Sequence, residues 1–123
     1  MRQLCYWMAG LMIAVSLGVS GCGGDQGKLV KAQTPTQEAF YALSANYDKE
    51  KYDQVMAQGE AFIDNYPEHF FVEAVHYYMG SSARKLGKTD QARAHFEKIT
   101  EMNPDGNWAQ LARFNMEEMD ASQ

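Results

Sequence analysis

Apolar residues recur at steps of three and four along most of the chain, with polar residues between them. The clearest stripe runs through Tyr52, Val55, Met56, Gly59, Phe62, Ile63 and Tyr66. This spacing is typical of an amphipathic α-helix that buries one face. It predicts helices over residues 35–48, 52–66, 70–86 and 90–103, and a fifth helix with its stripe over 108–119. We therefore predict an all-α fold.

Local signals mark where two of these helices begin and end. Thr34 and Gln37 are spaced as a capping box, with Pro at the first helical position between them. Gly87 separates the third and fourth helices, and a glycine there can adopt the left-handed conformation that closes a helix. Thr89 or Asp90 is expected to cap the fourth helix with its side chain.

The chain contains an internal repeat. Pro67 and Pro104 are 37 residues apart, and a shift by that distance also places Tyr77 onto Phe114. Each proline disfavours helical backbone in the residue before it, so both helices that precede a proline end there. The pattern predicts two stacked helical hairpins and a final helix that caps the open end.

The second hairpin, residues 73–104, resembles a tetratricopeptide repeat in length and in residue pattern. Gly80, Ala92, Phe96 and Pro104 match the repeat pattern in register, whereas His76, Met79 and Ala83 stand where Trp, Leu and Tyr are expected. The resemblance implies a short right-handed α-solenoid of two hairpins plus a C-terminal capping helix. It also implies a concave surface that binds a protein or peptide.

In such repeats, the concave surface comes from the first helix of each hairpin. The resemblance transfers this role to Gln37, Tyr41, Ala45, Asp48, Lys49, Ala74, Tyr77, Ser81, Arg84 and Lys85, and the 37-residue shift adds Leu111 and Phe114. We expect Tyr41, Tyr77 and Phe114 to form an aromatic row, with Arg84 and Lys85 offering positive charge to an acidic partner segment. The alternative is that these aromatic rings pack between helices.

The first 21 residues have the layout of a secretory signal peptide. Arg2 precedes an uncharged run of 16 residues, from Leu4 to Val19, that ends in small residues. That run is shorter than the ~20 residues that span a bilayer, although an uncleaved membrane anchor remains the alternative.

Residues 19–22, Val-Ser-Gly-Cys, resemble the lipobox of bacterial lipoproteins. The resemblance implies that Cys22 carries the lipid and becomes the first residue after cleavage; a cysteine without a lipid is the alternative. Gly23 follows where Asp would signal inner-membrane retention, so the resemblance implies an outer-membrane lipoprotein that faces the periplasm. In an organism with one membrane, the cell membrane is expected. Residues 22–34 then form a lipidated flexible tether, 35–120 the helical domain and 121–123 a frayed tail.

Together, these features resemble the outer-membrane lipoprotein branch of the tetratricopeptide family. That branch includes the tetratricopeptide lipoprotein of the barrel-assembly machinery and the C-terminal domain of the Tol-Pal coordinator, which bind other proteins. The resemblance implies an interaction module of the cell envelope. A pilus or secretion pilot lipoprotein is the alternative within the same class.

Composition and motifs narrow the function further. The net charge of −5 argues against nucleic acid as the main partner. No nucleophile elbow, phosphate loop or thiolate cluster is present, so we expect no enzyme and no cofactor. Glu73 and His76 are spaced like one half of a carboxylate-bridged metal site, but the second half is missing, so no metal is expected. A small metal- or ligand-binding helical domain is the remote alternative.

Overall fold

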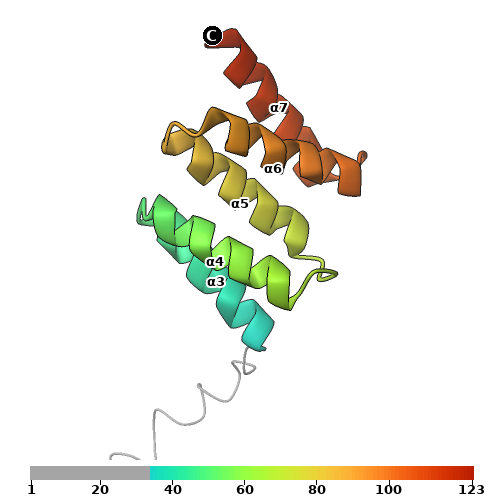
Figure 1. The fold of residues 1–123 in the computed structure, drawn as a ribbon. Coiled ribbons are helices and arrows are strands. Elements are labelled where there is room, and N and C mark those ends of the chain that lie inside the picture. Colours follow the sequence, from blue (N-terminus) through green and yellow to red (C-terminus); the bar gives the residue numbers. More distant parts are fainter. Residues whose placement is uncertain (1–33) are drawn as a thin grey trace, which may run out of the picture. The chain divides into compact units, whose positions relative to one another are not determined.

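The computed structural model describes residues 34–123, which form five α-helices and no strand (Figure 1). The helices are α3 (Pro35–Asp48), α4 (Tyr52–Asn65), α5 (Val72–Lys85), α6 (Thr89–Met102) and α7 (Asn107–Ala121). Each helix packs on the next, and α5 also contacts α3 and α7. The predicted all-α fold of successive hairpins is confirmed. The predicted signal peptide, Cys22 and the tether up to residue 33 lie outside the described residues.

The start of α3 has the predicted capping box. The Thr34 hydroxyl accepts a hydrogen bond from the Gln37 backbone N–H at 3.2 Å, and the Gln37 side chain accepts one from the Thr34 N–H at 3.0 Å. These two bonds satisfy N–H groups that have no partner within the helix. The predicted range of 35–48 is the range of α3.

The turn between α5 and α6 is a Schellman motif around Gly87. Its φ is +76°, as predicted, and its N–H donates to the Arg84 carbonyl at 3.1 Å, while the Lys88 N–H donates to the Ala83 carbonyl at 2.8 Å. The prediction that Thr89 or Asp90 caps α6 is wrong. Lys88 occupies the N-cap position without a side-chain bond, because this short turn already places Thr89 inside the helix.

The start of α5 also differs from the prediction. The helix begins at Val72 rather than at Phe70, since residues 67–71 form turns after Pro67. Two backbone hydrogen bonds hold that segment, from His69 N–H to the Tyr66 carbonyl at 3.2 Å and from Val72 N–H to the His69 carbonyl at 2.9 Å. Phe70 is left in the connection with 74% of its surface exposed.

The apolar stripes pack into two groups of buried side chains. One group joins α3, α4 and α5 through Leu43, Val55, Phe62, Val72, Val75 and Met79, and the other joins α5, α6 and α7 through Ala83, Ala92, Phe96, Ile99, Ala109, Ala112 and Met119. Phe62, Met79 and Phe96 are 2%, 1% and 0% exposed. Because α5 contributes to both groups, it is the central helix of the stack.

Close approach between helices relies on glycine in both hairpins. A Cβ atom added to Gly80 would lie 2.8 Å from Cε1 of Phe96, so any side chain at this position would push against the ring. The first hairpin has Leu43 at the position of the glycine and Gly59 at that of the aromatic ring. Gly59 lies directly against the side chain of Met79 of α5.

The last helix has a polar outer face. The 37-residue shift places His76, Gly80 and Ala83, which face α6, onto Arg113, Glu117 and Asp120 of α7. Arg113 donates a hydrogen bond to the Pro104 carbonyl at 3.0 Å, and Asp120 pairs with Arg93 of α6. These exposed polar groups replace the apolar surface on which a following helix would pack. The face therefore has the polar character expected of a capping helix.

Candidate partner-binding groove

A hollow of about 490 Å³ opens between α3, α5 and α7. Its lining residues are Tyr47, Tyr77, Ser81, Arg84, Lys85, Asn115 and Glu118. We call this surface the groove. Helices α3 and α5 are the first helices of the two hairpins, and α7 follows in the place where a third hairpin would begin. The repeat pattern predicts that these helices form the concave surface.

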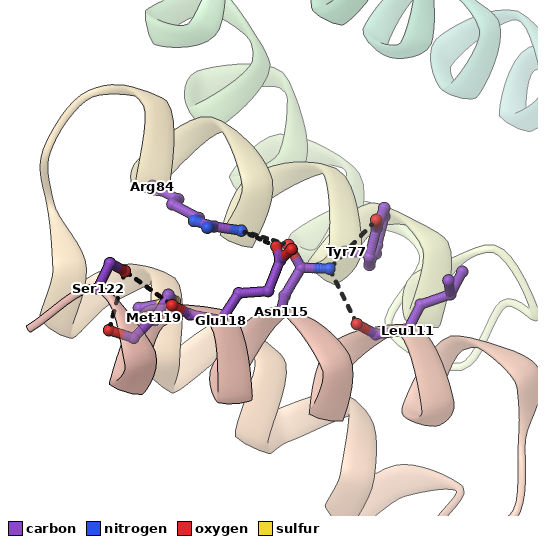
Figure 2. A network of polar contacts seen from close by, with 7 residues as sticks. All are labelled: Tyr77, Arg84, Leu111, Asn115, Glu118, Met119 and Ser122. Atoms are coloured by element: carbon purple, nitrogen blue, oxygen red, sulfur yellow. Dashed lines mark hydrogen bonds and ion pairs between the residues drawn. The ribbon is translucent and has the colours of Figure 1, made fainter.

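Polar contacts between α5 and α7 form one wall of the groove (Figure 2). The Arg84 guanidinium donates to Oδ1 of Asn115 and to Oε2 of Glu118, both at 3.0 Å. The Arg84 and Glu118 side chains are 34% and 46% exposed, so water screens the ion pair. This pair orients the guanidinium more than it stabilises the fold.

Tyr77 belongs both to the groove and to the helix packing. Its hydroxyl accepts a hydrogen bond from Asn115 Nδ2 at 3.4 Å, and the same amide donates to the Leu111 carbonyl at 2.9 Å (Figure 2). The Tyr77 ring lies 5.3 Å from that of Trp108 and packs against the core. The two alternatives considered for this ring, groove and helix packing, therefore both apply: its hydroxyl edge faces the groove while its ring supports α7.

Tyr47 forms the opposite wall, on α3. Burial raises the pKa of its hydroxyl, and the side chain of Ser81 opposes that shift. The ring packs edge-on against Tyr78 at 5.1 Å and Tyr52 at 5.7 Å. A fixed, neutral phenol is a suitable hydrogen-bonding surface for a peptide because little side-chain entropy is lost on binding.

The groove carries more positive than negative charge in an otherwise acidic protein. Arg84 and Lys85 lie opposite one carboxylate, that of Glu118. Lys85 is exposed and has no ion-pair partner within residues 34–123. Among the described residues, the groove thus presents one free cation beside one paired cation.

The predicted partner-binding residues fall into two sets. Tyr77, Arg84 and Lys85 line the groove, whereas Tyr41 and Phe114, 48% and 57% exposed, lie outside it on α3 and α7. No ring contact links Tyr77 with either of them in the described part of the chain, so the three rings do not touch one another as a continuous row. Ala74, assigned to the concave surface by resemblance, is only 2% exposed and serves helix packing.

The expected set omits Tyr47, Asn115 and Glu118. A signal for Glu118 was present, because the 37-residue shift places it onto Ser81 of the predicted concave surface, whereas Asn115 falls onto Tyr78, which is outside that set. The same shift places Tyr47 of α3 onto Arg84 of α5, so the repeat pattern also marked Tyr47.

The groove is not built as a metal site. Residues 34–123 contain no group of three or more His, Cys, Asp or Glu side chains placed to hold a metal ion. Glu73 accepts a hydrogen bond from Asn103 at 3.4 Å, and His76 contacts His95 instead. The i, i+3 pair considered from the sequence therefore splits between two separate contacts. The helices of the described part are all too short or too polar to span a membrane.

Comparison with known proteins identifies the central hairpin. A tetratricopeptide-repeat family model matches residues 74–106, which include most of α5 and all of α6. No curated protein matches the chain. The matched segment has the helix–turn–helix form, the Gly80–Phe96 contact and the terminal Pro104 of the repeat. Residues 74–106 are therefore a tetratricopeptide repeat, a module that generally mediates protein–protein interaction.

Proposed function

We propose that this protein is a lipid-anchored interaction module of the bacterial cell envelope, and that the groove binds a segment of a partner protein. The observation that carries the proposal is the hollow of about 490 Å³, walled by three helices and lined by tyrosines and cations. Its volume lies within the ~300–1,000 Å³ of ordinary ligand sites, enough to hold a few side chains.

The side chains of the groove favour an acidic segment with an aromatic or amide group beside the acid. A carboxylate of the partner can pair with Lys85, whose charge is not already engaged within the described residues. Arg84 is held by Asn115 and Glu118, so it offers a positioned but partly neutralised charge. The hydroxyls of Tyr47 and Tyr77 supply hydrogen bonds on either side.

Site-specific crosslinking in intact cells tests the groove. A photoreactive amino acid at Lys85 is expected to capture one defined protein. The same group at Lys88, an exposed residue in the α5–α6 turn that does not line the groove, is the matched control. Lys85→Glu, with a photoreactive group at Tyr47 on the opposite wall of the groove, should reduce the yield because the partner then meets a second carboxylate beside Glu118. Equal capture from both lysine positions would contradict a groove-specific contact.

Membrane anchoring is a separate part of the proposal. The residues that support it are the lipobox-like sequence at 19–22 and the uncharged run before it. Several acyl chains on Cys22 would hold the protein at the membrane stably, where a single chain binds only marginally. Cys22→Ala should release the protein into the soluble fraction and remove the lipid mass, whereas Cys5→Ala should leave the mature protein unchanged. Membrane retention of the Cys22→Ala protein at unaltered mass would exclude the lipid anchor and leave the groove proposal untouched.

A further inference from the structure

Two histidines meet between α5 and α6, away from the residues that line the groove. The Nδ1 atoms of His76 and His95 are 3.0 Å apart, and the ring centroids are 5.3 Å apart. His76 is 9% exposed, and His95 is half-buried. At 3.0 Å, one Nδ1 must donate its proton and the other must accept it with its lone pair, so the two rings form a neutral donor–acceptor pair.

The surroundings keep this pair neutral. Burial lowers the pKa of His76 to about 4, and the charge interactions with His95 and Lys98 of α6 add to the shift. Burial also lowers the pKa of His95, against the opposing charge of Glu60 on α4.

The spacing of the two nitrogens suits a shared ion. Two imidazole nitrogens at about 2.0 Å from one metal stand roughly 2.8 Å apart at a right angle and roughly 3.3 Å apart at the tetrahedral angle. The observed 3.0 Å lies between these values. Small rotations of both rings would direct both lone pairs to one ion, and the Nδ1 proton of the donor ring would move to its own Nε2. No net proton is released in that change.

We propose that His76 and His95 form a two-histidine binding site for a first-row transition-metal dication, Cu²⁺ or Zn²⁺, with water completing the coordination. Imidazole suits both ions, and Cu²⁺ is expected to bind more tightly by the usual order of divalent affinities. No third His, Cys, Asp or Glu completes the site within residues 34–123, so the ion is expected to be exchangeable rather than permanently held. The site does not depend on the proposed function of the groove.

Metal titration of the full chain tests the site. The wild-type protein should bind one Cu²⁺ or Zn²⁺ per chain through this pair, with a higher thermal midpoint in the presence of the ion. His76→Gln or His95→Gln should weaken this binding about tenfold or more, as loss of metal-supporting residues generally does. His69→Gln is the matched control, because it removes the remaining histidine of the chain and leaves the pair intact.

The two cysteines, Cys5 and Cys22, are retained in every variant, so any binding by thiols is common to all of them. Circular dichroism establishes that each variant keeps its helices. Electron paramagnetic resonance of the wild-type protein with one equivalent of Cu²⁺ provides a measurement that needs no variant, and coupling to two imidazole nitrogens is expected. Equal metal binding by the His76→Gln/His95→Gln protein, or a Cu²⁺ spectrum without nitrogen coupling, would overturn the proposal.

Discussion

The contact between Gly80 and Phe96 provides the most direct test of the helix packing. Substitution of Gly80 by Ala has two opposing effects. In the middle of α5, alanine favours the helix over glycine by about 1 kcal/mol. The added Cβ, however, would lie 2.8 Å from Cε1 of Phe96 and 3.0 Å from both Cδ1 and Cζ.

The steric effect is expected to be larger than the gain in helix propensity. Phe96 is fully buried between α5 and α6, and its ring is rigid, so the helices must separate to admit the methyl group. Overpacking of a core of this kind costs about 1–3 kcal/mol. A 2.8 Å clash with a rigid, buried ring belongs in the upper part of that range, about 2–3 kcal/mol. After the helix gain of about 1 kcal/mol is subtracted, Gly80→Ala should lower the free energy of unfolding by roughly 1–2 kcal/mol.

Gly59→Ala is a matched comparison, because Gly59 is also a buried glycine inside a helix. Its added Cβ would overlap Sδ and Cγ of Met79, a fully buried side chain, more closely than the Cβ at position 80 overlaps Phe96. Met79 must change rotamer to admit it, so Gly59→Ala should also lower the free energy of unfolding. Urea unfolding followed by helical circular dichroism measures both.

A double substitution checks the cause. Phe96→Leu removes part of the ring that the methyl group added at position 80 would strike. Gly80→Ala should therefore cost less in the Phe96→Leu protein than in the wild type. Wild-type stability of Gly80→Ala, or strict additivity of the two substitutions, would refute the close α5–α6 contact.

Three further predictions concern stability. The pKa of His76 falls from 6.5 to about 4 on folding. The folded state therefore loses stability as the pH falls from 6.5 to 4, because the unfolded chain takes up a proton that the folded chain excludes. The loss in the free energy of unfolding is about 3 kcal/mol. Urea midpoints measured against pH with a chelator should show this loss in the wild type and a flatter profile in His76→Gln. Thr34→Ala removes the side-chain cap of α3 and should lower the free energy of unfolding by about 1 kcal/mol. Ser44→Ala removes only a hydroxyl that donates to the Tyr41 carbonyl within the same helix and should change it little; equal effects would argue against the cap. Arg84→Ala breaks a partly exposed ion pair and should lower the free energy of unfolding by less than about 1 kcal/mol. A strong loss of partner capture in this variant, with its stability unchanged, would assign Arg84 to binding.

Much of the backbone was predictable because its determinants are local. The capping box at Thr34 and the left-handed Gly87 depend on residues within one turn of the helix, and both are found where the sequence predicts them. Pro67 and Pro104 end the preceding helices for the same local reason. One wrong prediction also has a local cause. Thr89 does not cap α6, because the backbone hydrogen bonds of the Schellman turn leave it inside the helix.

The apolar period determines which face of each helix is buried, and the repeat determines the order in which hairpins stack. Neither the apolar period nor the repeat determines which side chains contact each other across a helix pair. The contact of His76 with His95, 19 residues apart, and the bonds of Arg84 to Asn115 and Glu118 depend on helix rotation and separation. Those quantities follow from the packing of many side chains at once, including the absence of a Cβ at Gly80. The helices and their order can thus be inferred from the sequence alone, whereas the groove wall and the histidine pair are established only by the tertiary structure.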